Sequence, residues 1–238
     1  MRIIAMSDLH FKSGYDDKLK SLVQTIGKAD MVLLAGDLTH FGSAPELNSV
    51  LTLISKISSV IYAVPGNCDT QEIADGLNAR NIDLEGKAIL EGFCLVNGLG
   101  GVPKWRNKDY SFSEEELAQT LERGTNEANG LLNQNPGTYA RILLSHTPPY
   151  GSKADRAMYM KHVGSLSVAE HLQKVRYDVC ICGHIHECVG VTTWSNVQLV
   201  NCGPARRGYY VDINIDSTAN GALNIDIKSK RDGSRFWI

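Results

Sequence analysis

The chain has 238 residues, of which 43% are hydrophobic and 21% are charged, and this balance excludes an intrinsically disordered protein. Its formal net charge of −2 at pH 7 gives no support for non-specific binding to nucleic acid or to an anionic membrane. The length suits one α/β domain, and we predict a single domain over residues 1–238.

The first apolar run is interrupted early by polar residues. Ser7, Asp8 and His10 follow it after a few residues, so it is too short for a signal sequence or a membrane-spanning helix. Six cysteines are scattered through apolar segments, which favours buried, reduced thiols over disulfides in a chain of this size. We therefore expect a cytoplasmic protein with no membrane partner.

Five short apolar runs predict buried strands, and each ends in polar residues. The runs cover residues 2–6, 31–35, 60–64, 141–144 and 178–182. Between the first three of them, apolar residues at helical spacing predict helices over 16–27 and 46–57. Strands that alternate with helices are typical of βαβ units and a parallel sheet, whose ligands lie beyond the carboxyl ends of the strands.

The later parts of the chain have a different character. Ser113, followed by three glutamates and a thin apolar stripe, predicts a helical insertion at about 100–137 over one end of the sheet. Ser167 and Glu170 fit a capping box that opens another helix. From residue 189 onward, short alternating runs separated by Asn and Gly predict antiparallel strands.

Oxygen and imidazole donors follow all five predicted strands. They are Asp8 and His10, Asp37, Asn67, His146, and His184 with His186. Taken singly, such an aspartate is usually a helix cap and such a histidine is usually a surface residue, but five sites in order argue against chance. The set is large enough to surround two divalent ions if Asp37 bridges them.

A pair of ions indicates a particular chemistry. Two cations roughly 3.5 to 4 Å apart stabilise the attacking and the leaving oxygens of an in-line displacement at phosphorus, and they acidify a bridging water. The ligand set therefore predicts the hydrolysis of phosphate esters.

The ordered motifs DLH (8–10), GD (36–37), GNCD (66–69), SH (145–146) and GHIH (183–186) resemble the signature of the calcineurin-like metallophosphoesterases. That signature is D-x-H, G-D, G-N-H-[D/E], H and G-H-x-H, and it covers roughly the first four-fifths of this chain. SHTPPYG, HVGS and CGHIHE are also similar to a mainly prokaryotic, Icc-related subgroup. The resemblance implies an α/β fold, a four-layer αββα sandwich of two mixed β-sheets flanked by helices.

The resemblance also implies the metal ligands. One metal would be held by Asp8, His10, Asp37 and His186, and the second by Asp37, Asn67, His146 and His184. The ions that it implies are two divalent cations among Mn, Fe, Ni, Co and Zn, and the sequence does not choose between them.

Cys68 stands where the family pattern has a histidine near the substrate phosphate. A thiol is a weak donor, so we expect a working metal site with a changed environment for the leaving group. A packing role for Cys68 is favoured over a nucleophilic one, and Asp69 is left to orient a backbone or to cap a helix. We predict that His162, beside a Gly-Ser turn and a helix N-terminus, supplies the missing donor, with an exposed loop histidine as the equal alternative.

For three further basic residues the sequence allows two roles each. His40 is expected to be a loop residue or to lie behind the ligands. Arg206 and Arg207 could meet a phosphate, although a solvated surface pair is favoured. Asp37, Asn67 and His162 are thus the predicted catalytic residues, and Asn67 and His162 are also predicted to bind the substrate.

These observations predict a metal-dependent phosphoesterase, preferring phosphodiesters, that works by in-line attack of a metal-bridging hydroxide. The expected substrate is a small phosphodiester or a nucleotide-like molecule. A nuclease or nucleotide pyrophosphatase is the alternative on the same site, and the absence of a basic balance disfavours nucleic acid. A non-catalytic protein-binding scaffold is the alternative from another class, and the complete ligand set argues against it. The oligomeric state and the native metals are left open.

Overall fold

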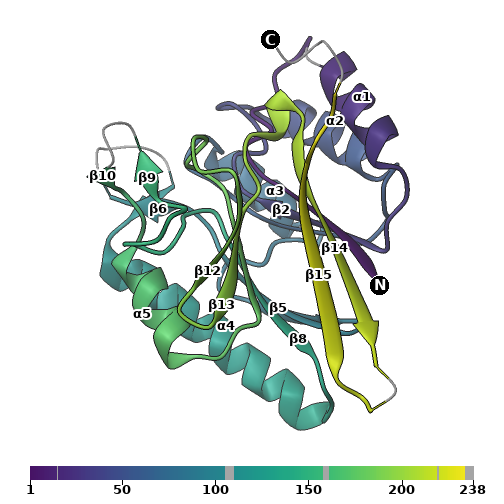
Figure 1. Ribbon diagram of the computed structural model, residues 1–238. Helices are drawn as coiled ribbons and strands as arrows, with labels where there is room; N and C mark the ends of the chain where they lie inside the picture. The colour runs from purple at the N-terminus through teal and green to yellow at the C-terminus, as the bar shows by residue number, and fades with distance from the viewer. Residues whose placement is uncertain (15, 105–109, 158–160, 219, 234–238) are drawn as a thin grey trace.

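The computed structural model describes residues 1–14, 16–104, 110–157, 161–218 and 220–233, and it consists of two facing β-sheets with helices on their outer sides (Figure 1). The first sheet has the order β15-β14-β1-β2-β3. Its strands are β1 (Arg2–Met6), β2 (Met31–Ala35), β3 (Ile61–Val64), β14 (Tyr209–Ser217) and β15 (Leu223–Arg231). The first three are parallel, and β14 runs antiparallel to both β1 and β15.

The second sheet has the order β12-β13-β11-β8-β5-β4. Its strands are β4 (Ala88–Glu91), β5 (Cys94–Leu99), β8 (Ala140–Ser145), β11 (Val179–Cys182), β12 (Gly190–Trp194) and β13 (Val197–Asn201). The four central strands are parallel, and the two edge strands are antiparallel. Two short ladders, β6 (Val102–Pro103) with β7 (Ser111–Phe112) and β9 (Arg156–Ala157) with β10 (Lys161–His162), lie outside the sheets.

The alternation of side chains along the strands builds the layers. On β1, Ile3 and Ala5 belong to the core between the two sheets, whereas Ile4 and Met6 pack against the helices. The helices α1 (Asp16–Ile26), α2 (Ala44–Ile54) and α3 (Gln71–Asn78) cover the first sheet, and α4 (Glu114–Gln134) and α5 (Leu166–Lys174) cover the second (Figure 1). The predicted four-layer αββα sandwich is confirmed.

The helix starts show one correct and one wrong prediction. Ser113 caps α4, since its hydroxyl accepts from the amide of Glu116 at 3.2 Å while the Glu116 carboxylate accepts from the amide of Ser113 at 2.7 Å. The N-cap of α5 is Ser165 and not Ser167, since the Ser165 hydroxyl accepts from the amide of Val168 at 3.2 Å. A residue of another helix explains the difference. The Glu114 carboxylate of α4 accepts from the Ser167 amide at 2.9 Å, in place of the predicted capping box between Ser167 and Glu170.

The second half of the chain corrects the sequence reading in two ways. The antiparallel strands predicted after residue 189 divide between the sheets, with β12 and β13 in the second sheet and β14 and β15 in the first, and β13 pairs in parallel with β11. Strands β4 and β5, which the analysis of apolar runs did not identify, contact α4. Within the predicted insertion at 100–137, residues 105–109 lie outside the described part, and α4 joins the outer helical layer.

In the described ranges, no helix has the length and apolar character needed to cross a membrane. The six cysteines are free thiols, and four of them, Cys94, Cys180, Cys182 and Cys202, are buried. Burial raises the pKa of Cys180 to about 12, so this thiol stays protonated at neutral pH.

Asp212 of β14 ties the first strand to the C-terminal hairpin. Its carboxylate accepts from Arg2 Nε at 3.0 Å, from Arg2 Nη2 at 2.9 Å and from Lys230 Nζ at 2.7 Å. The Arg2 hydrogen bond, opposed by burial and supported by Lys230, lowers the pKa of Asp212 from 3.8 to about 2. A lowered pKa in the folded state means that this stabilisation is present above pH 3.8 and is lost as the pH falls through 2.

We therefore predict that Asp212→Asn lowers the free energy of unfolding at pH 7 by about 2 kcal/mol, and that the difference from the wild type shrinks as the pH falls from about 4 to about 2. Urea unfolding at several pH values measures it. Asp226→Asn is the control, since Asp226 forms an exposed pair with Lys228 and its loss is expected to cost less than about 0.5 kcal/mol. Equal losses of unfolding free energy in the two variants would contradict the stabilising role assigned to Asp212.

Candidate metal centre

The seven predicted ligands come together where the carboxyl ends of five strands from the two sheets meet. Asp8 and His10 follow β1, Asp37 follows β2, Asn67 follows β3, His146 follows β8, and His184 and His186 follow β11. Backbone hydrogen bonds join the loops within each sheet, from the amide of His10 to the carbonyl of Asp37 at 2.9 Å and from that of Gly183 to the carbonyl of His146 at 3.1 Å. Between the sheets, the amide of His184 donates to Asp8 Oδ2 at 3.0 Å. The two sheets thus contribute to one site.

The backbone of this site is held in an uncommon conformation. Positive φ angles occur at Asp8 (54°), His10 (44°), Asp37 (53°) and His184 (65°). The described residues contain eight such non-glycine positions, so half of them are predicted ligands. Each costs on the order of 1–3 kcal/mol and persists only where surrounding contacts impose it, which is typical of a functional site.

Four donor atoms form the first group. Asp8 Oδ1 lies 3.1 Å from His186 Nε2, which in turn lies 3.4 Å from His10 Nε2. His10 Nε2 also lies 3.6 Å from Asp37 Oδ2. Asp8, His10 and His186 form one of the clusters in the described residues that could hold a metal ion.

The second group forms around His146. Its Nδ1 lies 2.8 Å from the carbonyl oxygen of Ala35, which only accepts, so Nδ1 carries a hydrogen. Nε2 lies 3.3 Å from Asn67 Oδ1 and 3.5 Å from Asp37 Oδ1. In the neutral ring, Nε2 therefore presents a lone pair to two oxygen acceptors, an arrangement that a cation between them satisfies.

The remaining predicted ligand, His184, lies beside this second group. Its ring centroid is 5.1 Å from that of His146, and its backbone amide donates to Asp8 Oδ2 at 3.0 Å. Asp37 joins the groups, since one of its oxygens faces His10 and the other faces His146. The residues present fit divalent cations, since Asp8, Asp37 and His146 also form a cluster whose ligand atoms lie within 4.8 Å of one another.

The protonation states of His10 and His184 suit metal binding. Burial lowers the pKa of His10 to about 4, and it lowers that of His184 to the same range, so both rings are neutral at pH 7 and can offer a lone pair. Burial would raise the pKa of Asp8, but the hydrogen bond from His186 holds it well below its usual range. His146 differs, because burial acts to lower its pKa but the Asp37 and Asp8 carboxylates outweigh burial and raise the pKa, so a bound cation would compete with a proton for this ring.

Two glycines make room for the ligands. A Cβ atom on Gly66 would collide with Asp37 and would lie 2.8 Å from His146 Cε1, and one on Gly183 would collide with Ser7 and Asp8. The glycines of the G-N and G-H motifs are therefore needed for the close approach of strands from opposite sheets.

Asp69 holds two ligand loops together. It is fully buried and accepts from the amides of Leu38 at 3.1 Å, Thr39 at 2.8 Å and Gly66 at 2.9 Å. Burial and the neighbouring Asp37 carboxylate raise the pKa of Asp69 to about 6. Of the two roles considered from the sequence, Asp69 orients the backbone, and Thr70 occupies the N-cap position of α3.

Cys68 contacts the site through its backbone and its side chain. Its amide donates to Asp37 Oδ1 at 2.7 Å, and its Sγ accepts from Asn67 Nδ2 at 3.4 Å. Sγ also lies with ring nitrogens of His10 and His40 in a cluster whose atoms are within 4.8 Å of one another. The sequence did not indicate that His40 comes this close to Cys68, because both lie in loops after different strands.

His162 has a different partner from the other predicted residues. Its Nδ1 lies 2.6 Å from Asp155 Oδ1, and its ring is 5.5 Å from that of Tyr150. Asp155 is fully buried and accepts from the amide of Gly151 at 3.0 Å. Within the described residues, no hydrogen bond or ion pair joins His162 to the seven predicted ligands, and its role toward a substrate stays a prediction.

Comparison with known proteins gives the family context. A family model described as calcineurin-like phosphoesterase matches residues 1–188, a range that contains all seven predicted ligands. An uncharacterized protein of Methanocaldococcus jannaschii is 33% identical over 218 residues, which cover 89% of this chain and 91% of that protein. A protein of Arcobacter nitrofigilis described as a probable glycerophosphodiester phosphodiesterase is 24% identical over 246 residues, covering 92% and 84%.

Solved structures share the fold. A protein of Thermus thermophilus superimposes with a TM-score of 0.63 at 17% identity, covering 94% of this chain and 97% of that one. Phosphopantetheinyl hydrolase from Mycobacterium tuberculosis gives a TM-score of 0.56 at 17% identity, covering 86% and 90%.

The close approach at Gly66 generates a prediction. Gly66→Ala will displace Asp37 and His146, and we expect affinity for divalent ions to fall at least about tenfold. Metal content after dialysis against Mn²⁺ measures the change. Gly130→Ala is the matched control, because nothing lies within 4 Å of its added methyl group on α4. Retention of two ions by Gly66→Ala at wild-type affinity would show that these contacts do not shape the site.

The buried carboxylate of Asp69 generates a second prediction. Asp69→Ala leaves three buried amides unpaired, so we expect the metal-free protein to lose about 2–4 kcal/mol of unfolding free energy. Urea unfolding measures this loss. Asp75→Ala, which removes an exposed carboxylate from α3, is expected to change it by less than about 0.5 kcal/mol. A loss below about 1 kcal/mol for Asp69→Ala would be inconsistent with its role in joining the loops.

Proposed function

This chain belongs to the calcineurin-like phosphoesterase family, and from that premise we propose that it is a metal-dependent phosphodiesterase acting on a small phosphodiester. The observation that carries the proposal is the position of Asp37. Its oxygens lie 3.6 Å from His10 Nε2 and 3.5 Å from His146 Nε2, at the junction of two donor groups. A site that holds two cations side by side suits displacement at phosphorus.

The first group, Asp8, His10 and His186, would hold one cation, and Asn67, His146 and His184 would hold the other, with Asp37 shared. When bound, two such cations withdraw charge from phosphoryl oxygens and lower the pKa of water. Asn67 turns its oxygen toward His146 and its amide nitrogen toward Cys68, so the nitrogen can donate to a phosphoryl oxygen on that side.

Two observations support a diester over a monoester. Cys68 stands where the family pattern has an imidazole, so the site has one group fewer to contact phosphoryl oxygens, and a diester carries a single negative charge whereas a monoester carries nearly two at pH 7. The Arcobacter nitrofigilis relative is described as a probable phosphodiesterase. We also propose a cytoplasmic location, supported by the six free thiols, and expect Mn²⁺ to serve as the metal because carboxylate and amide oxygens suit it.

The test uses metal-stripped protein resupplied with Mn²⁺, Ni²⁺, Zn²⁺ or Mg²⁺. We expect bis(4-nitrophenyl) phosphate to be hydrolysed with a higher kcat/KM than 4-nitrophenyl phosphate, and Asp37→Ala to lower the diester value roughly a hundredfold or more. Asp75→Ala, which removes a surface carboxylate, is the control and keeps the wild-type value. A preference for the monoester would contradict the diester assignment, and the absence of turnover in protein that binds two ions would contradict catalysis.

A further inference from the structure

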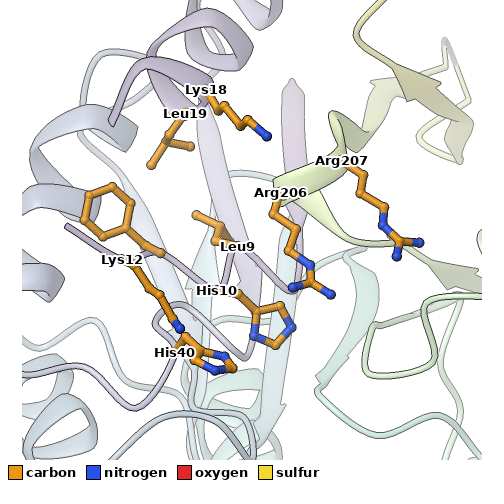
Figure 2. A pocket seen from close by; sticks show the side chains of 10 residues that line it. Leu9, His10, Lys12, Lys18, Leu19, His40, Arg206 and Arg207 are labelled. Atoms are coloured by element: carbon orange, nitrogen blue, oxygen red, sulfur yellow. The ribbon is translucent and has the colours of Figure 1, made fainter. Parts of the chain in front are cut away.

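A basic pocket opens beside the metal centre. It has a volume of about 430 Å³, and His10 and His40 form part of its lining (Figure 2). Four of its ten lining residues are lysine or arginine, two are histidine and none is acidic. The four are Lys12, Lys18, Arg206 and Arg207. Because the chain as a whole carries a formal charge of −2, this local excess of positive charge is a property of the pocket.

Two of the basic side chains, Lys12 and Arg206, lie on either side of the predicted ligand His10. Figure 2 shows Lys12 and Arg206 on opposite sides of the His10 ring, with Lys18 reaching toward the pocket from α1. The charges of Lys12 and Arg206 both act on His40, whose ring centroid is 5.7 Å from that of His10. Among the residues that the structure describes, neither Lys12 nor Arg206 forms an ion pair with a carboxylate.

The position of Arg206 is built into the backbone. It lies in the short 3-10 helix η2 (Ala205–Arg207), where the amide of Ala205 donates to the carbonyl of Ser7 at 2.8 Å and that of Arg206 donates to the carbonyl of Asp8 at 3.4 Å. Ala205 is 2% exposed. The backbone that carries the guanidinium is thus fixed to the loop that carries two predicted ligands, so the exposed side chain of Arg206 extends from a point held close to the metal centre.

The size and the walls of the pocket indicate what it holds. A volume of about 430 Å³ is in the range of small-molecule sites and exceeds the need of one phosphate group. Leu9, Leu19 and Ala205 supply apolar wall beside the charges, which suits a short carbon segment. Several cations with no acidic neighbour in the lining favour a dianion, and the planar guanidinium of Arg206 matches phosphate geometry.

We propose that this pocket binds a second phosphate group, carried on one ester arm of a phosphodiester whose scissile phosphate lies at the metal centre. The proposal rests on the proposed phosphodiesterase function and names its substrate class, a diester with an additional phosphate. Lys12 and Arg206 contact the second phosphate, and the apolar wall contacts the linking carbons.

A pair of substrates tests this assignment. Ethyl 4-nitrophenyl phosphate and its 2-(phosphonooxy)ethyl analogue differ only in the second phosphate, and release of 4-nitrophenolate from the Mn²⁺-loaded enzyme gives kcat/KM for each. We expect the wild type to prefer the analogue at least about tenfold, and Lys12→Met and Arg206→Met each to reduce the ratio of the two values about tenfold. Lys20→Met, which removes an exposed charge from α1 outside the pocket, is the matched control and leaves the ratio unchanged.

A binding measurement separates this proposal from the proposed function. Calorimetric titration of the Mn²⁺-loaded protein with methylenebisphosphonate is expected to give an affinity about tenfold weaker in Lys12→Met and Arg206→Met than in the wild type and Lys20→Met. If neither ester is hydrolysed but this difference in affinity is found, phosphate binding in the pocket is supported and the phosphodiesterase proposal fails. Equal affinities in all four proteins, or equal kcat/KM for the two esters in the wild type, would overturn the proposal that the pocket binds a second phosphate.

Discussion

Asp37 places one carboxylate oxygen near His10, which follows a strand of the first sheet, and the other near His146, which follows a strand of the second. Asp37 and Asp8 are both buried, and burying two carboxylates is costly unless cations compensate for them. Because the two sheets face each other, the carboxyl ends of five strands surround the same space. The donors at these strand ends can then hold the cations that compensate for the buried carboxylates. The fold and the expected metals are therefore linked, since the metals would balance the charge that the fold brings together.

Several unfavourable local features are concentrated at this junction. Left-handed backbone at Asp8 and His10 and the close approach of Gly66 to Asp37 are retained only where the neighbouring loops impose them. Asp69 provides much of that restraint, because its buried carboxylate binds amides from the loops after β2 and β3. The rigid part of the site is therefore its ligand-bearing loops, whereas the adjacent pocket is formed by side chains such as Lys12 and Arg206, which are exposed.

The sequence was sufficient for the layers, and it identified seven donors that the structure brings together at one place. Donors such as Asp8 and Asn67 could be singled out because each lies within three residues of the end of an apolar run, and parallel strands place their carboxyl ends at one edge. Contacts between distant segments could not be predicted. The Glu114 carboxylate accepts from the amide of Leu166 next to Ser165, the N-cap of α5, and Asp155 is the hydrogen-bond partner of His162. Arg206, favoured from the sequence as a solvated residue, is exposed, but it also lines the pocket beside His10 because η2 is hydrogen-bonded to the loop after β1.

The most direct test of this account is a crystal structure of the protein grown with Mn²⁺, with the ions located by anomalous scattering. We predict two peaks on either side of the Asp37 carboxylate, one among Asp8, His10 and His186 and the other among Asn67, His146 and His184. A single ion, or an ion held instead by His10, His40 and Cys68, whose donor atoms also lie within 4.8 Å of one another, would contradict the shared role of Asp37.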